Sequence, residues 1–327
     1  MFNNFVNRHD LHTLVERGPR LALRTVAKFA QSKHRRVQSA WQHSSAPPTN
    51  WWNIPAVRAR WNALISGDPA LDYRQYALQK FLSQRRDLIA LSPGCGTGHR
   101  EIQWAKLDAF SRIDAYDLSE PRIEEARKRA RESECDNIVH FHSGDIYALD
   151  LPRDHYDIVF AEQSLHHFSP LEPLLTRLRA SLKPDGYFLV NEFVGPTRFQ
   201  WTDRQLEVVN GLLSTLPEEC RRIWRTGALK RRVFRPSKLR MVLTDPSEAI
   251  ESARIVPLLE EMFEVTELTG YGGTVLHLLL NGIAHHFTSD DAPCRRLLDS
   301  CFAIEDALIE SGELASDYAF AVCRKRR

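Results

Sequence analysis

Three glycines alternate with other residues in the segment LSPGCGTGHRE, which follows the apolar run DLIAL. Gly94, Gly96 and Gly98 remove side chains from a short stretch, so a ligand could lie directly against the main chain there. The spacing G-x-G-x-G departs from the dinucleotide fingerprint, whose third glycine would fall at His99. No lysine follows the glycines, as a phosphate-binding P-loop would require. The turn therefore indicates an adenosine-containing cofactor other than a dinucleotide.

Two aspartates are placed to help hold such a cofactor. Asp117 ends the segment IDAYD, where a carboxylate can accept hydrogen bonds from both hydroxyls of a ribose. Asp145, in HSGDI, follows the next expected strand and could meet the adenine end of the same ligand. Together with the glycines, these residues predict a nucleoside site at one edge of a sheet.

Histidines and carboxylates further along the chain could move a proton. SLHHF places His166 and His167 just beyond the apolar run YDIVFAEQ, and histidine titrates in the range useful for a general base. Adjacent residues leave a strand end in different directions, so we expect one of them, His166, to face the substrate. Alternatively, both histidines cap the following helix and pack in the interior. Glu162 is a rival base, and Glu192 could orient a substrate hydroxyl or amine or be an ordinary surface carboxylate.

The composition is that of an ordinary globular protein. The chain has 327 residues, of which 43% are hydrophobic and 26% charged, and its net charge of +2 favours neither nucleic acid nor membrane. Six scattered cysteines form no CxxC pair, so we expect neither a disulfide framework nor a zinc site, and no other metal motif is present. No apolar run approaches the ~20 residues of a membrane span. Arginines interrupt the apolar stretches near the N-terminus, so the prediction is a cytoplasmic protein without a secretory leader.

The first forty residues are rich in lysine and arginine and are expected to be helical, ending near the linker HSSAPPTN. Such a basic helix could contact anionic lipid or a partner, or it could be a charge-biased surface helix. The sequence leaves both interpretations open.

Short apolar runs then alternate with helical segments, which predicts an α/β fold with a doubly wound, mostly parallel, seven-stranded sheet. The expected strands are DLIALS, RIDAYDLS, IVHFHSGD, YDIVFAEQ, YFLVNEF, FEVTELTGYGG and DYAFAVCRK. The expected parts are a helical extension (1–80), a cofactor-binding core (81–195), a helical insertion (196–258) and the last two strands with a second insertion (259–327). We expect the insertions to form a lid over the carboxyl edge of the sheet, where open α/β sheets bind ligands.

The motifs LSPGCGTG, AYDLS, SGDI, YDIVFAEQSLHHF and LKPDGYFLVNEF resemble, in order and spacing, those of class I S-adenosylmethionine-dependent methyltransferases. The resemblance covers roughly residues 85–195 and the last two strands. It is strongest to the small-molecule branch that includes ubiquinone and sugar methyltransferases. It implies a Rossmann-like methyltransferase fold and S-adenosyl-L-methionine as cofactor. The cofactor-binding residues that it implies are Ser92, Pro93, Gly94, Cys95, Gly96, Gly98, Asp117, Leu118, Asp145, Ile146, Glu162 and Gln163.

Within this set, the resemblance assigns the glycine turn to the methionine part of the cofactor and Asp117 to the ribose. Glu162 and Gln163 are expected beneath the sulfonium region. One position departs from the family pattern: family members commonly carry an acidic residue two positions before the first glycine, and this chain has Ser92 there. Recognition of the amino group of the cofactor would then rely on other groups or on water.

Candidate substrate-binding residues follow the fifth expected strand. GPTRFQWTDRQ contains Arg198, Gln200 and Trp201, and GYGGT contains Tyr271. An aromatic ring beside hydrogen-bonding groups suits a polar ligand such as a sugar, and Arg198 suits a phosphate or carboxylate. Core packing is the alternative for Trp201, and a simple turn is the alternative for GYGGT.

The sequence thus predicts an enzyme that transfers a methyl group in line to a small polar acceptor, such as a sugar or polysaccharide precursor, with a histidine or glutamate base. A non-catalytic cofactor-fold subunit that binds a partner remains an alternative. A nucleic-acid methyltransferase is a second alternative. Enzymes that methylate base amines usually carry Asn/Asp-Pro-Pro-aromatic where this chain has AEQSLHHF, so no nucleic acid is expected as a partner. Neither the methylated atom nor the oligomeric state follows from the sequence.

Overall fold

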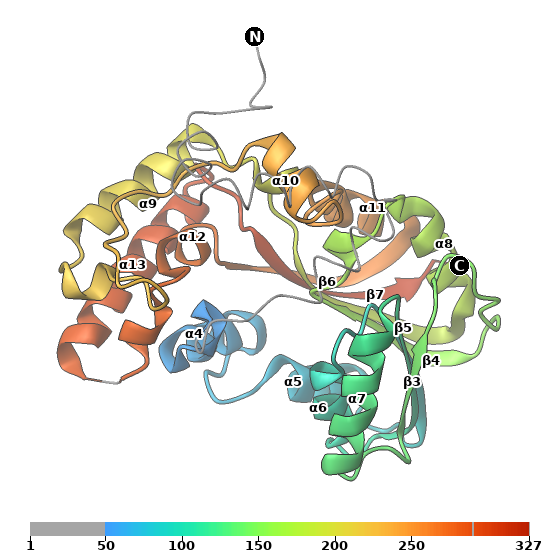
Figure 1. Ribbon diagram of the computed structural model, residues 1–327. Helices are drawn as coiled ribbons and strands as arrows, with labels where there is room; N and C mark the ends of the chain where they lie inside the picture. The colour runs from blue at the N-terminus through green and yellow to red at the C-terminus, as the bar shows by residue number, and fades with distance from the viewer. Residues whose placement is uncertain (1–49, 290, 327) are drawn as a thin grey trace. The chain divides into compact units, whose positions relative to one another are not determined.

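The computed structural model describes residues 50–289 and 291–326 (Figure 1). The basic segment, for which the sequence predicted a helix and a linker and left a lipid contact open, lies outside the described residues, apart from the last linker residue, Asn50. The chain divides into two compact units. The sheet unit comprises Leu71–Val194, Ile250–Thr269 and Ala319–Arg327, and the helical unit comprises the described residues up to Ala70 with Gly195–Ala249 and Gly270–Tyr318. Within the part of the chain that the structure describes, no helix combines the length and the apolar character needed to cross a membrane.

Seven strands form one sheet in the order β3-β2-β1-β4-β5-β7-β6. They are β1 (Leu88–Pro93), β2 (Phe110–Asp117), β3 (Val139–Ser143), β4 (Tyr156–Glu162), β5 (Leu182–Phe193), β6 (Phe263–Gly272) and β7 (Tyr318–Lys325). β1 pairs in parallel with β2 and β4, β2 with β3, and β4 with β5. A parallel neighbour can be reached only through a crossover connection, which is why helical segments separate the apolar runs of the sequence. The predicted α/β fold with a seven-stranded, mostly parallel sheet is confirmed.

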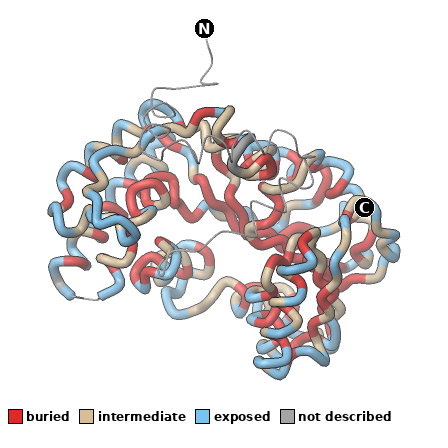
Figure 2. Tube along the Cα trace, in the orientation of Figure 1, coloured by how far each residue is buried: buried red, intermediate tan, exposed pale blue. Residues whose placement is uncertain are grey.

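Both faces of the sheet are covered, as β4 illustrates. The helices of the sheet unit are α5 (Tyr73–Phe81), α6 (His99–Ala105), α7 (Glu120–Glu132), α8 (Leu171–Ser181) and α11 (Ile255–Met262), with the 3-10 turns η2 (Leu165–His167) and η5 (Ser252–Arg254). Phe160 of β4 stacks on Trp104 of α6, with ring centroids 5.1 Å apart. Its neighbour Val159 belongs to the core cluster that β4 forms with α8 and α11. Successive strand residues point to opposite faces, so the strands are buried between two helical layers (Figure 2).

The fifth strand begins at Leu182, earlier than the run YFLVNEF predicted. Leu182 pairs with Tyr156, whereas Tyr187 pairs with Ile158, so the register shifts between these two pairs. The residues KPDG therefore form an irregularity inside the strand. In the sequence analysis, this strand started at Tyr187.

The helical unit is built mainly from helices. They are α4 (Pro55–Ser66), α9 (Asp203–Thr215), α10 (Lys238–Thr244), α12 (Leu276–Leu280) and α13 (Ala292–Glu310), with the 3-10 turns η1 (Trp51–Asn53), η3 (Thr197–Phe199), η4 (Glu219–Arg221) and η6 (Ala284–Phe287). A buried carboxylate, Glu305 of α13, accepts hydrogen bonds from the backbone N–H groups of Val275 (2.8 Å) and Leu276 (3.1 Å). The Arg60 guanidinium lies 3.1 Å from the same carboxylate. The two backbone hydrogen bonds hold the start of α12 against α13, and the ion pair with Arg60 joins α13 to α4.

Candidate active site

The glycine-rich turn that joins β1 to α6 is fastened to the end of β2. Gly94, Gly96 and Gly98 have φ angles of 76°, 59° and 73°, in the left-handed region that is costly for other residues. The N–H of Gly94 donates to the carbonyl of Tyr116 at 2.7 Å, and the N–H of Gly96 donates to Asp117 Oδ2 at 2.9 Å. The turn therefore needs glycine for its backbone conformation, whether or not a ligand is present.

The three glycines differ in what surrounds them. A Cβ at Gly98 would lie 2.4 Å from the ring of Phe141, and Gly94 is similarly crowded by protein atoms. A Cβ at Gly96 would meet only the guanidinium of Arg122, the far end of a flexible side chain, at 3.2 Å. The sequence attributed all three glycines to ligand approach. In the structure, Gly98 and Gly94 allow close packing within the protein, whereas the nearest atoms to Gly96 belong to the end of the Arg122 side chain.

The residues expected at the ribose and adenine lie at the carboxyl ends of β2 and β3. Asp117 is half-buried and its Oδ1 accepts the N–H of Ser119 at 2.8 Å. Leu118 is half-buried, Asp145 is exposed and Ile146 is buried. The carboxylate of Asp145 closes a turn by accepting a backbone N–H at 3.0 Å. Both carboxylates are thus held in place by backbone donors.

Glu162, at the end of β4, is surrounded by donors from the protein itself. The indole N–H of Trp104 donates to Oε1, while the hydroxyl of Tyr73 (2.5 Å) and the guanidinium of Arg74 (2.7 Å) donate to Oε2. Glu162 and Arg74 are 5% and 8% exposed, so the ion pair is buried. The sequence offered Glu162 as a cofactor contact or a rival base. These bonds give it a structural role, joining α5 and α6 to β4.

The residue after Glu162 has a strained backbone. Gln163 has a φ angle of 52°, which costs a residue with a side chain of order 1–3 kcal/mol. Its backbone and side-chain N–H groups both donate to the carbonyl of Asn191, at 2.9 and 3.1 Å. Gln163 therefore links the end of β4 to β5, next to the turn that carries the two histidines.

The departure from the family pattern at Ser92 is accompanied by a buried carboxylate that the sequence analysis missed. The Ser92 hydroxyl donates to Oε1 of Glu101 at 2.7 Å, and Glu101 is 3% exposed. No residue that the structure describes makes a hydrogen bond to Oε2 of Glu101. Burial raises the pKa of Glu101 to about 7. The available signal was an acidic residue four positions before Ala105, on the buried side of α6.

Two further neighbours of Ser92, Pro93 and Cys95, are also buried. Burial raises the pKa of the Cys95 thiol well above its usual value, so this cysteine stays protonated. Both residues shape the turn without contributing charge to it.

His166 is paired with Glu192. Glu192 is 0% exposed, and its Oε2 lies 2.7 Å from Nδ1 of His166. Its Oε1 accepts the backbone N–H groups of Ser164 and of Leu165, the latter at 2.6 Å. A carboxylate only accepts hydrogen bonds, so the proton of the neutral imidazole sits on Nδ1 and its basic lone pair is on Nε2. The sequence expected Glu192 to be at the surface or to touch the substrate; instead it is buried and positions His166.

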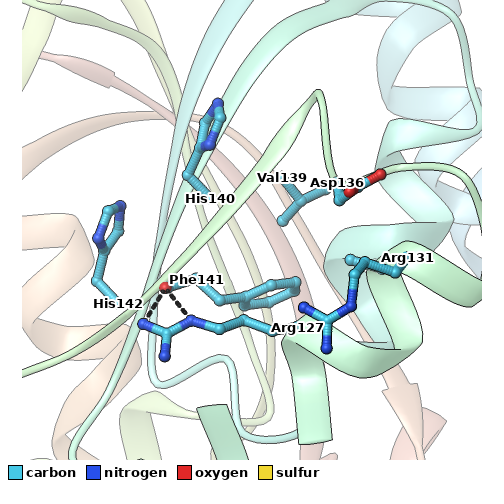
Figure 3. A pocket seen from close by; sticks show the side chains of 8 residues that line it. Arg127, Arg131, Asp136, Val139, His140, Phe141 and His142 are labelled. Atoms are coloured by element: carbon cyan, nitrogen blue, oxygen red, sulfur yellow. Dashed lines mark hydrogen bonds between the residues drawn. The ribbon is translucent and has the colours of Figure 1, made fainter. Parts of the chain in front are cut away.

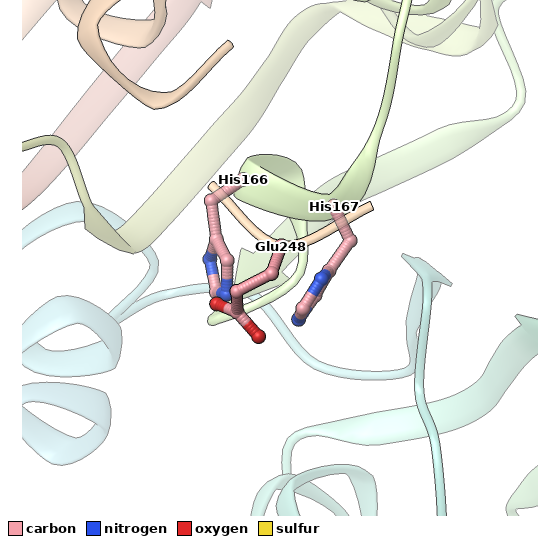
Figure 4. Close-up of side chains that lie close together, drawn as sticks. All are labelled: His166, His167 and Glu248. Atoms are coloured by element: carbon pink, nitrogen blue, oxygen red, sulfur yellow. The ribbon is translucent and has the colours of Figure 1, made fainter. Parts of the chain in front are cut away.

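The two histidines leave the η2 turn on the same side (Figure 4), with ring centroids 4.1 Å apart. The expectation that adjacent residues diverge was wrong, because the pair sits on a 3-10 turn and not at an extended strand end. His166 is 7% exposed and His167 is half-buried.

The four candidate substrate-binding residues all belong to the helical unit. Arg198 donates to a backbone carbonyl at 3.1 Å, and the side chain of Gln200 donates to two, at 2.9 and 3.0 Å. Tyr271 is 1% exposed. Trp201 is 8% exposed and stacks on Phe199 at 5.4 Å, and its indole N–H has no acceptor among the described residues. Contact of these residues with a substrate stays a prediction, as does the lid formed by the insertions.

A pocket between α7 and β3 lies at the edge of the sheet (Figure 3). Arg127 donates two hydrogen bonds to the carbonyl of Phe141, at 2.9 and 3.1 Å, and His140 and His142 line the same pocket. These residues differ from those expected to hold a cofactor, so we do not include this pocket in the candidate site.

The chain matches a known protein family. Residues 85–261, more than half of the chain, match a family described as "Methyltransferase domain". The chain belongs to this family. The sequence-based assignment to the class I S-adenosylmethionine-dependent methyltransferases is confirmed, and with it S-adenosyl-L-methionine as the cofactor.

Individual proteins similar to this chain are also named as methyltransferases. The chain is 29% identical over 104 residues to a 27-O-demethylrifamycin SV methyltransferase of Amycolatopsis mediterranei, covering 32% of this chain and 38% of that protein. It is 32% identical over 108 residues to a malonyl-[acyl-carrier protein] O-methyltransferase of Priestia megaterium, covering 33% and 38%. The match thus spans well under half the length of either relative. The solved structure of a geranyl diphosphate C-methyltransferase from Streptomyces coelicolor A3(2) shares the fold at 14% identity, with a TM-score of 0.51 over 91% of this chain and 99% of that one.

The carboxyl ends of the strands fit this cofactor. Three buried polar atoms there lack a hydrogen-bond partner among the described residues, namely Glu101 Oε2, Ser119 Oγ and Ser164 Oγ. Buried polar atoms in native proteins are normally paired, so a polar ligand bound at these strand ends could satisfy them. Other unpaired buried atoms lie in the helical unit, so they alone do not define the site. S-adenosylmethionine carries the ribose hydroxyls, carboxylate and ammonium group that could pair with them.

Proposed function

We propose that this protein transfers a methyl group from S-adenosylmethionine to a small polar acceptor, and that His166 takes up the proton that the acceptor loses. The observation that carries this proposal is the 2.7 Å contact between Nδ1 of His166 and Oε2 of the fully buried Glu192. When bound, the cofactor supplies an activated methyl group. The protein then has to align the acceptor, exclude water and accept a proton.

The arrangement of Glu192 and His166 suits a general base. The proton of an acceptor hydroxyl passes to Nε2 of His166, and the resulting imidazolium keeps its Nδ1–H against Glu192. The carboxylate is held in place because its other oxygen accepts two backbone N–H groups of the η2 turn. Glu162 is a weaker candidate for this role, because an arginine, a tyrosine and a tryptophan already engage its oxygens.

For the cofactor, we assign the ribose hydroxyls to Asp117 and the adenine end to Asp145 and Ile146. The glycine turn meets the methionine part, with Gly96 as the point of closest approach. The position of Asp117 at the end of β2, held by two backbone donors, supports its assignment.

For the acceptor, we propose an oxygen atom on a small polar molecule, with a sugar or polysaccharide precursor as the first class to test. The names of the two relatives refer to methylation at oxygen, of malonyl-[acyl-carrier protein] and of a rifamycin, and oxygen acceptors need a base.

The test has two stages. Titration of the protein with S-adenosylhomocysteine should give saturable binding; its absence at millimolar ligand would favour a non-catalytic subunit. The protein is then incubated with metabolite fractions and S-adenosylmethionine bearing a deuterated methyl group, and labelled products are identified by mass spectrometry. Saccharide fractions should become labelled, and label confined to other fractions would assign a different acceptor.

A further inference from the structure

Three buried glutamates near the carboxyl edge of the sheet differ in how completely they are paired. Both oxygens of Glu162 receive hydrogen bonds from side chains, and both oxygens of Glu192 are engaged by backbone N–H groups and His166. Oε1 of Glu101 accepts the hydroxyl of Ser92, whereas its Oε2 is buried with no donor among the residues described.

Glu101 also forms no salt bridge among the described residues, in contrast to Glu162. Glu162 has the guanidinium of Arg74 at 2.7 Å, but the side-chain partner of Glu101 is the neutral hydroxyl of Ser92. A buried carboxylate without a cation is unfavourable, and its orphaned oxygen lacks a hydrogen bond as well. A ligand that brought both a positive charge and an N–H donor would relieve both deficits.

S-adenosylmethionine has two cationic centres, and one of them meets both requirements. The sulfonium has no N–H group, whereas the ammonium of the methionine part has three donors and no acceptor, like a lysine side chain. We propose that Glu101 binds this ammonium group, and so supplies the acidic side chain that the chain lacks at Ser92. This inference rests on the proposed use of the cofactor and names the residue that recognises its amino group.

The experiment compares two nucleosides that differ in the amino acid part. S-adenosylhomocysteine carries the ammonium group, and 5′-methylthioadenosine keeps only the adenine, ribose and thioether. Calorimetric titration of Glu101→Gln should show S-adenosylhomocysteine binding about tenfold to a hundredfold more weakly than in the wild type, because one charge-assisted hydrogen bond is lost. Binding of 5′-methylthioadenosine should change less than about twofold. Equal weakening of both ligands, or of neither, would overturn the inference.

Matched variants separate charge recognition from damage to the fold. Glu124→Gln makes the same chemical change at an exposed position of α7 and should leave both affinities unchanged. Ser92→Asp in the Glu101→Gln background returns a carboxylate to the neighbouring position and should recover part of the affinity for S-adenosylhomocysteine alone. Failure of this rescue, with 5′-methylthioadenosine still bound, would count against charge as the basis of recognition.

A measurement on the wild type covers the case in which Glu101→Gln fails to fold. An S-adenosylhomocysteine analogue in which hydrogen replaces the amino group should bind about tenfold to a hundredfold more weakly than the parent. Equal binding of analogue and parent would overturn the inference. Failure of the wild type to bind any of these nucleosides would instead contradict the proposed function itself.

Discussion

The sheet unit contains two kinds of buried carboxylate. Glu162 and Glu192, at the ends of β4 and β5, are held by donors from the protein on both oxygens. Glu101, on α6, is equally buried, but one of its oxygens accepts the hydroxyl of Ser92 and the other has no donor in the described residues. The difference separates the acidic groups that the protein satisfies by itself from one that it leaves partly unsatisfied.

The physical reason lies in the cost of burying charge. A buried ion loses its hydration and is tolerated only when hydrogen bonds and opposite charges replace it. A carboxylate that is fully buried and paired on both oxygens can therefore stabilise the fold or position a neighbour, but it has little left to offer a ligand. Asp117 also accepts a backbone N–H on each oxygen, but it is only half-buried. A buried carboxylate with an unpaired oxygen destabilises the free protein, and a ligand that pairs with it removes this cost. Replacing such a residue should therefore raise the stability of the free protein and lower its affinity for the ligand.

The largest effect should come from removing a buried carboxylate whose two oxygens are both paired. Glu162→Ala leaves the buried guanidinium of Arg74 with only the longer contact to Asp72 at 3.4 Å, which should lower the free energy of unfolding by about 3 kcal/mol in urea titrations followed by circular dichroism. Glu125→Ala, which breaks the exposed pair with Arg129, should cost less than about 1 kcal/mol. Similar costs for the two variants would show that the buried pair contributes little.

Removal of Glu101, the carboxylate with an unpaired oxygen, should have the opposite effect on stability. Burial raises the pKa of Glu101 from 4.5 to about 7, so the folded protein binds more protons than the unfolded chain between these values. The stability of the wild type should therefore fall as the pH rises through this window, and Glu101→Gln should remove that contribution. Without ligand, the variant should gain up to ~2–3 kcal/mol relative to the wild type between pH 4.5 and pH 7. A difference in unfolding free energy that is constant across the window would contradict the buried, ionisable state of Glu101.

The pair formed by Glu192 and His166 should affect the reaction more than binding. His166→Ala should reduce turnover by ~10²-fold, with the affinity for S-adenosylhomocysteine nearly unchanged. His140→Ala, on β3, is the matched control and should leave turnover intact. Unchanged turnover in His166→Ala would assign the proton transfer to another group, or show that the acceptor needs no base.

The smallest of these effects should come from Asp117, whose carboxylate also fastens the glycine turn. Asp117→Ala should make the binding free energy of S-adenosylhomocysteine less favourable by ~1–3 kcal/mol in calorimetric titrations, because hydrogen bonds to the ribose are lost. Asp117→Asn keeps one acceptor oxygen, which can accept only one of the N–H groups of Gly96 and Ser119, and it should recover part of the loss. An Asp117→Ala variant with full affinity would remove Asp117 from the ribose site.

Much of the fold could be predicted because it depends on local patterns. The apolar runs and the helical segments between them gave all seven strands, and boundary errors arose where strand pairing decided, as at Leu182. The candidate site was harder. The sequence identified His166 and Glu192 as separate candidates, but not that one holds the other, because 26 positions separate them and only the neighbouring strands β4 and β5 bring them together.

The sequence by itself determined the order of strands and helices, the glycine turn and the aspartates that follow β2 and β3, because each rests on residues close together in the chain. Only the tertiary structure decided which carboxylates are neutralised and which are not. Whether a carboxylate is neutralised depends on side chains from different elements: Glu162 lies beside the cation Arg74, whereas Glu101 lies beside the neutral Ser92. Burial then determines the cost of each carboxylate.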